Sequence, residues 1–183
     1  MTLENCIVCS SEENKPLYEG IVKCSNCNHV YANLTLTDEE YKSLYTYDYF
    51  HGDEYSNYIA DKPVLQRNFL SRLTVLKKHS SKTQYQSLLE IGAAYGFFIE
   101  KAQLFYKDVM GIDITKSGVD YAANHLKLNV KKIDFLKWNT PKNKWDIICL
   151  WDTIEHLKEP NLFIKKANSL IKKNGLIAIT TGD

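Results

Sequence analysis

The chain has 183 residues, of which 44% are hydrophobic and 25% charged, as in ordinary globular proteins. Lys and Arg number 23 against 22 Asp and Glu, and a formal net charge of +1 gives no electrostatic reason to expect a nucleic acid or an anionic membrane as partner. No apolar run is long enough to span a membrane, and the N-terminus lacks the basic start and apolar stretch of a signal peptide. We therefore expect a cytoplasmic protein whose cysteines are thiols or metal ligands, and its oligomeric state stays open.

Two Cys-x-x-Cys pairs, 14 residues apart, mark residues 1–34 as a small zinc-ribbon module. The pairs are Cys6 with Cys9 and Cys24 with Cys27. Each pair turns two thiolates toward one point, and two pairs complete a tetrahedral zinc site without an open coordination position. So short a segment has too little apolar core to fold without a metal, which makes the predicted zinc structural. A redox pair is one alternative, and His29 in place of one cysteine is another.

Residues 35–84 are predicted to form an aromatic-rich helical linker or lid. Thr37 followed by three acidic residues is typical of a helix N-cap, and we expect a short helix from there to about Tyr45. A second helix has Asp61 as its cap, Pro63 in its first turn, and an apolar face formed by Leu65, Phe69, Leu73 and Leu76. The aromatic residues before this helix either cover a ligand or pack the linker against the main domain.

From residue 85 to 183, short apolar strands alternate with helices. Strands are predicted at 87–91, 109–113, 130–133, 145–151 and 176–180, with Cys149 as a core residue. The intervening helices are expected to bury Phe98, Ala102 and Phe105, then Val119, Ala123 and Leu126, then Phe163, Ala167, Leu170 and Ile171, with Asn174 and Gly175 ending the last one. This alternation predicts an α/β fold: a doubly wound, mostly parallel, Rossmann-like sheet with helices on both faces.

A glycine-bearing turn at 92–96 joins the first of these strands to the helix that follows it. Gly92 and Gly96 allow the backbone to approach a ligand closely. Asp113 ends the next strand 21 residues after Gly92, at an offset where a carboxylate can accept ribose hydroxyls. This combination is typical of nucleotide cofactors in general.

Acidic residues at the strand ends favour one class of cofactor over another. They are Glu90, Asp113, Asp134 and Asp152. A dinucleotide presents a pyrophosphate, which is bound by backbone N–H groups and repelled by carboxylates. Phe97 also stands where the dinucleotide fingerprint needs its third glycine. The pattern therefore favours a ligand that carries an ammonium group and a sulfonium.

Together, these motifs resemble those of the class I S-adenosylmethionine-dependent methyltransferases. Residues 90–96 resemble motif I, with Ala94 in place of its middle glycine. Residues 145–157 resemble the fourth strand with its Glu-His-Leu signature, and residues 173–175 resemble the turn before the fifth strand. The cysteine pairs and the Tyr49-Phe50 segment resemble a subgroup with an N-terminal zinc ribbon, which is linked to modification of sugars or other small metabolites.

The resemblance implies S-adenosylmethionine as cofactor, with Asp113 on its ribose and Asp134 and Phe135 on its adenine. The cofactor-binding residues that it implies are Glu90, Ile91, Gly92, Ala93, Gly96, Phe97, Asp113, Ile114, Asp134, Phe135 and Trp151. The sheet of this family continues beyond the fifth strand, whereas the chain stops at Asp183 and would leave that strand as an edge. We therefore expect a core that is truncated after the fifth strand.

The predicted function is methyl transfer to a small-molecule acceptor, such as a sugar or a carrier-linked metabolite. Such transfer needs alignment of the acceptor with the methyl group, and a hydroxyl or amine acceptor also needs a base. His156 is the candidate base, with Glu155 and Asp152 as alternatives; Glu155 and His156 could instead organise the loop. An inactive cofactor-binding or zinc-dependent interaction module, and a nucleotide-dependent oxidoreductase, are the competing functions.

Overall fold

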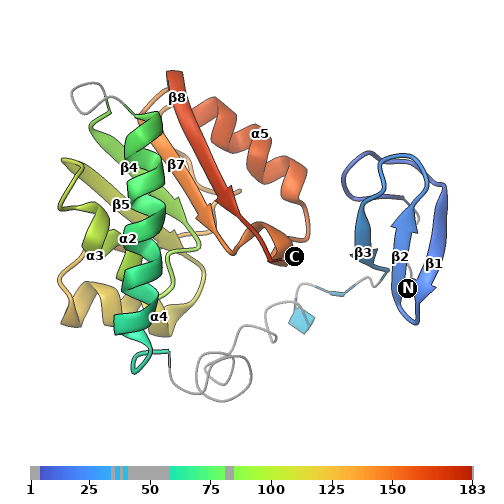
Figure 1. The fold of residues 1–183 in the computed structure, drawn as a ribbon, viewed down its shortest axis with the longest axis horizontal. Helices are drawn as coiled ribbons and strands as arrows, with labels where there is room; N and C mark the ends of the chain where they lie inside the picture. The colour runs from blue at the N-terminus through green and yellow to red at the C-terminus, as the bar shows by residue number, and fades with distance from the viewer. Residues whose placement is uncertain (1–4, 34–35, 38, 41–57, 81–84, 183) are drawn as a thin grey trace.

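The structure, a computed structural model, describes residues 5–33, 36–37, 39–40, 58–80 and 85–182 (Figure 1). Most of the helix predicted after Thr37, and the aromatic residues from 41 to 57, lie outside these ranges. The predicted cap itself is present as a capping box. The Thr37 backbone N–H donates to Glu40 Oε2 at 2.8 Å, and the Glu40 backbone N–H donates to Thr37 Oγ1 at 3.2 Å.

The cysteine-containing segment folds as a three-stranded antiparallel sheet. Its strands are β1 (Asn14–Tyr18), β2 (Ile21–Cys24) and β3 (Val30–Ala32), with β2 in the middle. The apolar core beneath this sheet consists of few buried residues, namely Cys6, Val22, Cys24 and Tyr31. A core of this size supplies little stability without a cross-link or a metal.

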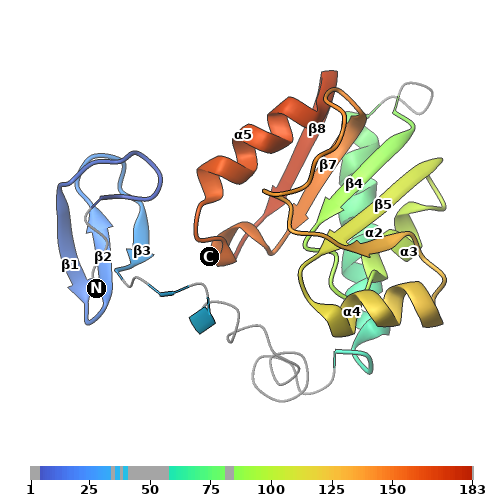
Figure 2. The same cartoon turned by 180° about the vertical axis from the view of Figure 1, so that it is seen from behind.

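The main sheet has five parallel strands in the order β6-β5-β4-β7-β8. The strands are β4 (Ser87–Ile91), β5 (Asp108–Asp113), β6 (Val130–Lys132), β7 (Trp145–Trp151) and β8 (Ile171–Thr180). Helices α2 (Lys62–His79), α3 (Phe97–Ala102) and α4 (Lys116–Asp120), followed by the π-helical turn η2 (Tyr121–His125), cover one face, and α5 (Pro160–Leu170) covers the other (Figures 1 and 2). The predicted doubly wound, Rossmann-like fold is confirmed.

Burial on both faces explains why these strands are almost entirely apolar. Along β7, Ile147 and Cys149 pack against the α2 side, whereas Ile148 and Leu150 pack against the α5 side, and all four are fully buried. The sheet reverses its direction of winding between β4 and β7, since later strands are added on opposite sides of this pair. In sheets of this type, ligands bind at the carboxyl ends of the strands at this switch point.

Helix α2 packs onto the main sheet although it lies inside the predicted linker, 35–84. Phe69, Leu73 and Leu76 are buried in the same apolar core as α3 and β4, which confirms the predicted face. Asp61 lies at the N-cap position and Pro63 in the first turn, as expected, but the Asp61 side chain makes no capping hydrogen bond. No helix in the described ranges is both long and apolar enough to cross a lipid bilayer.

Two sequence predictions, about the helices after β4 and after β5, are wrong in detail. Helix α3 ends at Ala102, and Phe105, beyond it, is 42% exposed. After Val119 the chain widens into the π-helical turn η2, and this turn buries Ala122 instead of Ala123.

The last helix ends earlier than predicted, because β8 begins at Ile171. Asn174 and Gly175 therefore do not cap a helix but lie in a bulge, where the pairing of β7 with β8 jumps from Trp145–Ile171 to Ile147–Leu176. Asn174 adopts the left-handed conformation (φ 65°), which explains the helix-ending signal in the sequence.

Candidate functional site

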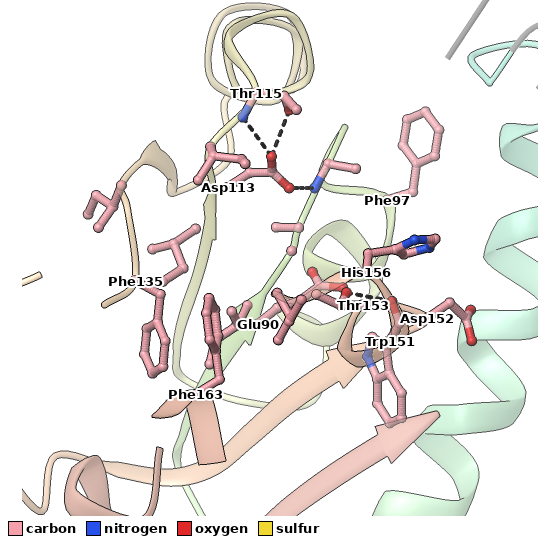
Figure 3. A pocket seen from close by; sticks show the side chains of 18 of the residues that line it. Glu90, Phe97, Asp113, Thr115, Phe135, Trp151, Asp152, Thr153, His156 and Phe163 are labelled. Atoms are coloured by element: carbon pink, nitrogen blue, oxygen red, sulfur yellow. Dashed lines mark hydrogen bonds between the residues drawn. The ribbon is translucent and has the colours of Figure 1, made fainter. Parts of the chain in front are cut away.

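A cavity of about 250 Å³ opens at the carboxyl ends of β4, β5 and β7 (Figure 3). Its wall includes the predicted residues Glu90, Ile91, Gly92, Ala93, Phe97, Asp113, Ile114, Asp134, Phe135, Trp151 and His156. Asp152 lies there as well, so all four acidic residues at or near the carboxyl ends of strands line one cavity. Gly96 is the one predicted cofactor-binding residue that does not line it.

The two glycines of the turn between β4 and α3 are needed for contacts within the protein. Gly92 (φ 82°) lies against Thr153, whose Oγ1 would be only 2.5 Å from a Cβ atom at position 92. Gly96 (φ 76°) precedes α3 and lies against the buried side chains of Ala122 and Leu128. The glycines therefore set the path of the turn, and the ligand-facing backbone is that of residues 92–94.

Asp113 joins the turn after β4 to the turn after β5. Its Oδ2 accepts a hydrogen bond from the Ala94 backbone N–H at 2.8 Å. Its Oδ1 accepts from the Thr115 backbone N–H at 2.8 Å and from Thr115 Oγ1 at 2.7 Å. A carboxylate has about four acceptor sites, so these bonds fix its orientation and leave acceptor capacity toward the cavity.

Glu90 is a buried carboxyl in the cavity wall with an unsatisfied oxygen. Its side chain is 2% exposed, and within the described ranges Oε2 has no hydrogen-bond partner. Burial, and then the neighbouring charge of Asp113, raise the pKa of Glu90 well above its ordinary value, against the opposing effect of Arg72. A cationic ligand group at this position would supply the missing partner.

Arg72 on α2 is a cavity residue that the sequence analysis missed. Its guanidinium donates to Asp152 Oδ2 at 2.6 Å and lies over the Trp151 ring, 5.3 Å from the ring centroid. Asp152 in turn accepts from Thr180 Oγ1 at 2.7 Å, so α2, β7 and β8 meet at this carboxylate. The apolar spacing of α2 predicted its buried face, and no local signal marked Arg72 as part of the site.

An apolar surface forms the opposite wall of the cavity. Phe135 and Phe163 pack with ring centroids 5.3 Å apart, and Ile133 and Leu157 lie beside them. The Asp134 carboxylate caps its own turn by accepting from the Leu136 backbone N–H at 3.1 Å. The cavity thus has an acidic side and an apolar side, a combination suited to a ligand with a cationic end and a planar ring.

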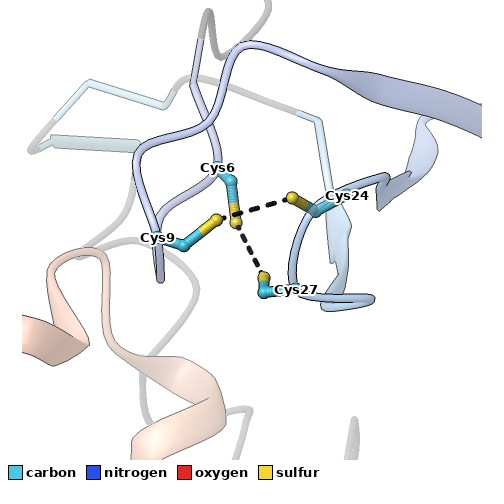
Figure 4. Close-up of side chains that lie close together, drawn as sticks. All are labelled: Cys6, Cys9, Cys24 and Cys27. Atoms are coloured by element: carbon cyan, nitrogen blue, oxygen red, sulfur yellow. Dashed lines mark hydrogen bonds between the residues drawn. The ribbon is translucent and has the colours of Figure 1, made fainter.

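The four N-terminal cysteines form a single cluster (Figure 4). All four sulfur atoms lie within 4.8 Å of one another, with Cys6 3.7 Å from Cys27 and Cys9 3.6 Å from Cys24. These distances are too long for disulfides and suit four thiolates around one metal ion.

Hydrogen bonds around Cys9 favour its thiolate. The Asn26 side chain donates to Cys9 Sγ at 3.5 Å, and together with the Ser11 backbone it lowers the pKa of the Cys9 thiol to about 6. His29 stacks on Tyr31 and is not part of the cluster.

Comparison with known proteins identifies the family. Residues 34–183 match the family described as a methyltransferase domain. A ubiquinone biosynthesis O-methyltransferase from Pelagibacter ubique is 36% identical over 99 residues, which cover 51% of this chain and 41% of that protein. The protein of the same name from Glaesserella parasuis is 30% identical over 130 residues, or 66% of this chain and 55% of that protein. The chain thus spans about half the length of the curated relatives it matches.

Solved structures share the fold. An S-adenosylmethionine-dependent methyltransferase from Aquifex aeolicus has a TM-score of 0.50 at 24% identity, covering 79% of this chain and 72% of that one. The N-methyltransferase NodS from Bradyrhizobium japonicum, solved with S-adenosylhomocysteine, has a TM-score of 0.51 at 23% identity, covering 60% and 59%. The sheet order and these neighbours define a class I methyltransferase fold. The chain belongs to the family of S-adenosylmethionine-dependent methyltransferase domains.

Proposed function

We propose that the chain binds S-adenosylmethionine in this cavity and transfers its methyl group to a hydroxyl of a small molecule. The observation that carries the proposal is the buried oxygen of Glu90 in the cavity wall, which has no hydrogen-bond partner among the residues that the structure describes. A buried carboxyl without a partner is costly, and native proteins keep such groups where a ligand completes the interaction. The ammonium group of the cofactor's methionine part has the required charge and donors.

Other residues of the wall would hold the remaining parts of the cofactor. Asp113 would accept the ribose hydroxyls, and Ile114, Asp134 and Phe135 would surround the adenine. Arg72, which Asp152 holds through one nitrogen, has further donors for the cofactor's carboxylate.

His156 is proposed as the base for the acceptor. It lies at the end of η3 (Ile154–His156), on the exposed rim of the cavity. The bound cofactor supplies a methyl carbon activated by its sulfonium. His156 would take the proton of the acceptor hydroxyl as the new O–CH₃ bond forms and the S–CH₃ bond breaks. The alternative role for Glu155 and His156 is to organise this loop.

The names of the relatives support a hydroxyl acceptor, since both are O-methyltransferases. A sugar or a carrier-linked metabolite remains the proposed kind of molecule. The cysteine cluster would hold a structural zinc ion, because its four sulfurs fill a tetrahedral shell and leave no position for a substrate. We also propose the division into a zinc module (1–34), a linker (35–84) and a cofactor-binding core (85–183).

Calorimetric titration with S-adenosylhomocysteine and with NAD tests the proposed cofactor. We expect heat of binding with the first ligand and none with the second. Asp113→Ala should weaken binding of S-adenosylhomocysteine about 10- to 100-fold, because it removes charge-assisted hydrogen bonds to the ribose. Asp108→Ala, an exposed position on the same strand, is the matched control.

Asp113 also holds two turns, so the melting temperature of each variant is measured beside its affinity. Asp113→Asn keeps the size of the side chain but turns an amide nitrogen toward one of the two backbone N–H groups, so it should bind S-adenosylhomocysteine more weakly than wild type and also melt at a lower temperature. The absence of any heat with S-adenosylhomocysteine in folded protein would refute the proposed function.

A further inference from the structure

Residues 156–163 lie between the cavity and the cysteine cluster. His156, Leu157 and Phe163 line the cavity. Between them in the chain, Asn161 near the start of α5 contacts the cysteine module (Figure 4 shows this part of the core beside the cluster). One short segment therefore contacts both the cavity and the module that carries the cysteine cluster.

The contact made by Asn161 is specific to its amide group. Nδ2 donates to the backbone oxygen of Ile7 at 3.1 Å and to that of Val8 at 2.8 Å. Both carbonyls belong to the turn between Cys6 and Cys9, so the amide uses its two hydrogens on two consecutive residues of one Cys-x-x-Cys turn. Both cysteines of that turn belong to the cluster. Lys158 adds a second contact, from Nζ to the Leu36 backbone oxygen at 3.2 Å.

The segment begins at the end of the short turn η3 and continues into the first turn of α5. The turn η3 is a single 3-10 turn, in which the His156 N–H donates to Thr153 and the Leu157 N–H donates to Ile154. Single 3-10 turns have poor hydrogen-bond geometry and open at low free-energy cost. A contact at Asn161 can therefore shift the position or the order of the cavity wall.

We propose that Asn161 docks the Cys6–Cys9 turn onto the cavity wall, so that metal binding at the cysteine cluster and ligand binding in the cavity stabilise each other. The cavity half of this inference rests on the proposed function. Coupling between sites is reciprocal, so a metal that tightens ligand binding is itself bound more tightly in the presence of ligand, by the same factor. The two-state element is the 156–163 segment, docked or released.

The experiment compares full-length chains by hydrogen exchange. Exchange is measured at the backbone amides of residues 156–159 and 161–163, since Pro160 has none. The samples are wild type with zinc, wild type after chelation under reducing conditions, and Asn161→Asp and Asn161→Ala, each with zinc. Asn161→Asp keeps the shape of the side chain and replaces the two donated hydrogens by an oxygen that repels both carbonyls. Asn168→Ala, an exposed asparagine two turns further along α5, is the matched control. Amides of β4 and β7 report whether the core stays folded.

We expect exchange in the segment to accelerate about fivefold or more on chelation and in both Asn161 variants, with Asn168→Ala and the β4 and β7 amides unchanged. The affinity for S-adenosylhomocysteine should fall by a similar factor in the same samples. Unchanged exchange in the segment in Asn161→Asp overturns the coupling, whether or not the ligand binds. If zinc-loaded wild type does not bind S-adenosylhomocysteine at all, the proposed function is overturned. The exchange rates in residues 156–163 then still show whether Asn161 docks the Cys6–Cys9 turn.

Discussion

At the residue scale, Glu90 combines a structural cost with a chemical use. It lies in the fully buried strand β4, and its carboxyl has an oxygen that no group in the described ranges satisfies. Such a group destabilises the ligand-free chain, and a position of this kind is maintained when function requires it. The stability lost by burying the Glu90 carboxyl and its contribution to ligand binding can be measured separately in a variant that keeps the size of the side chain but cannot ionise.

Glu90→Gln tests this separation. Because the native state holds the Glu90 proton to a higher pH than the unfolded chain does, the wild-type free energy of unfolding should fall as pH rises above the ordinary glutamate pKa. The slope is at most about 1.4 kcal/mol per pH unit and ends above the raised pKa. Glu90→Gln should lose this slope, and with it most of its affinity for S-adenosylhomocysteine.

Urea unfolding between pH 5 and pH 8 measures the slope, and calorimetry measures the affinity. Glu39→Gln, an exposed glutamate in the described part of the linker, serves as the control. A wild-type free energy of unfolding with no more pH dependence than that of Glu90→Gln would show that the Glu90 proton is not held in the native state.

At the scale of elements, helix α2 links the linker to the core. Leu73 of α2 is 1% exposed and belongs to the core cluster shared with α3 and the sheet. Val75, two residues further along, is 53% exposed. The helix therefore contributes to the stability of the cofactor-binding unit although it precedes the first strand of that unit.

Leu73→Ala should destabilise the protein by about 2–5 kcal/mol, because it removes buried methyl groups and leaves a cavity. Val75→Ala on the same helix should change the free energy of unfolding by less than about 0.5 kcal/mol. Urea unfolding followed by circular dichroism gives both values. Similar, small effects of the two variants would mean that α2 is not packed as the structure describes.

Most strands of the main sheet could be predicted from the sequence, whereas the three N-terminal strands, the start of β8 and the ends of the helices could not. Strands buried on both faces, such as β7, are continuous apolar runs that the sequence marks clearly. The end of α5 depends instead on the pairing of Ile171 with Trp145 in a neighbouring strand, which outweighs the local signal of Asn174. The acids of the site were found because they follow strands, whereas Arg72 depends on how α2 packs and has no local signal.

At the scale of the whole molecule, the chain combines two sheets with different sources of stability. The main sheet buries apolar side chains on both faces, whereas the N-terminal sheet has a core of four buried residues, two of which are cysteines. The first is stabilised by packing, and for the second we propose that a metal at the cysteine cluster supplies the missing stability.

Cys24→Ser should therefore abolish stoichiometric zinc binding and unfold the N-terminal sheet alone. Native mass spectrometry gives the zinc content, and hydrogen exchange at Val22 and Tyr31 reports on the sheet. The exposed Ser25→Ala is the matched control and should keep one zinc per chain. Protection at Val22 and Tyr31 equal to that of wild type would show that the module folds without metal.

The contact between Gly92 and Thr153 limits which substitutions the chain tolerates at these two positions during evolution. The two positions belong to different halves of the sheet, one after β4 and one after β7, and the space that a side chain at 92 would need is filled by the threonine. A substitution at either position therefore alters which residues are tolerated at the other. Sequence drift in the two halves is thereby coupled next to the cavity that both halves form.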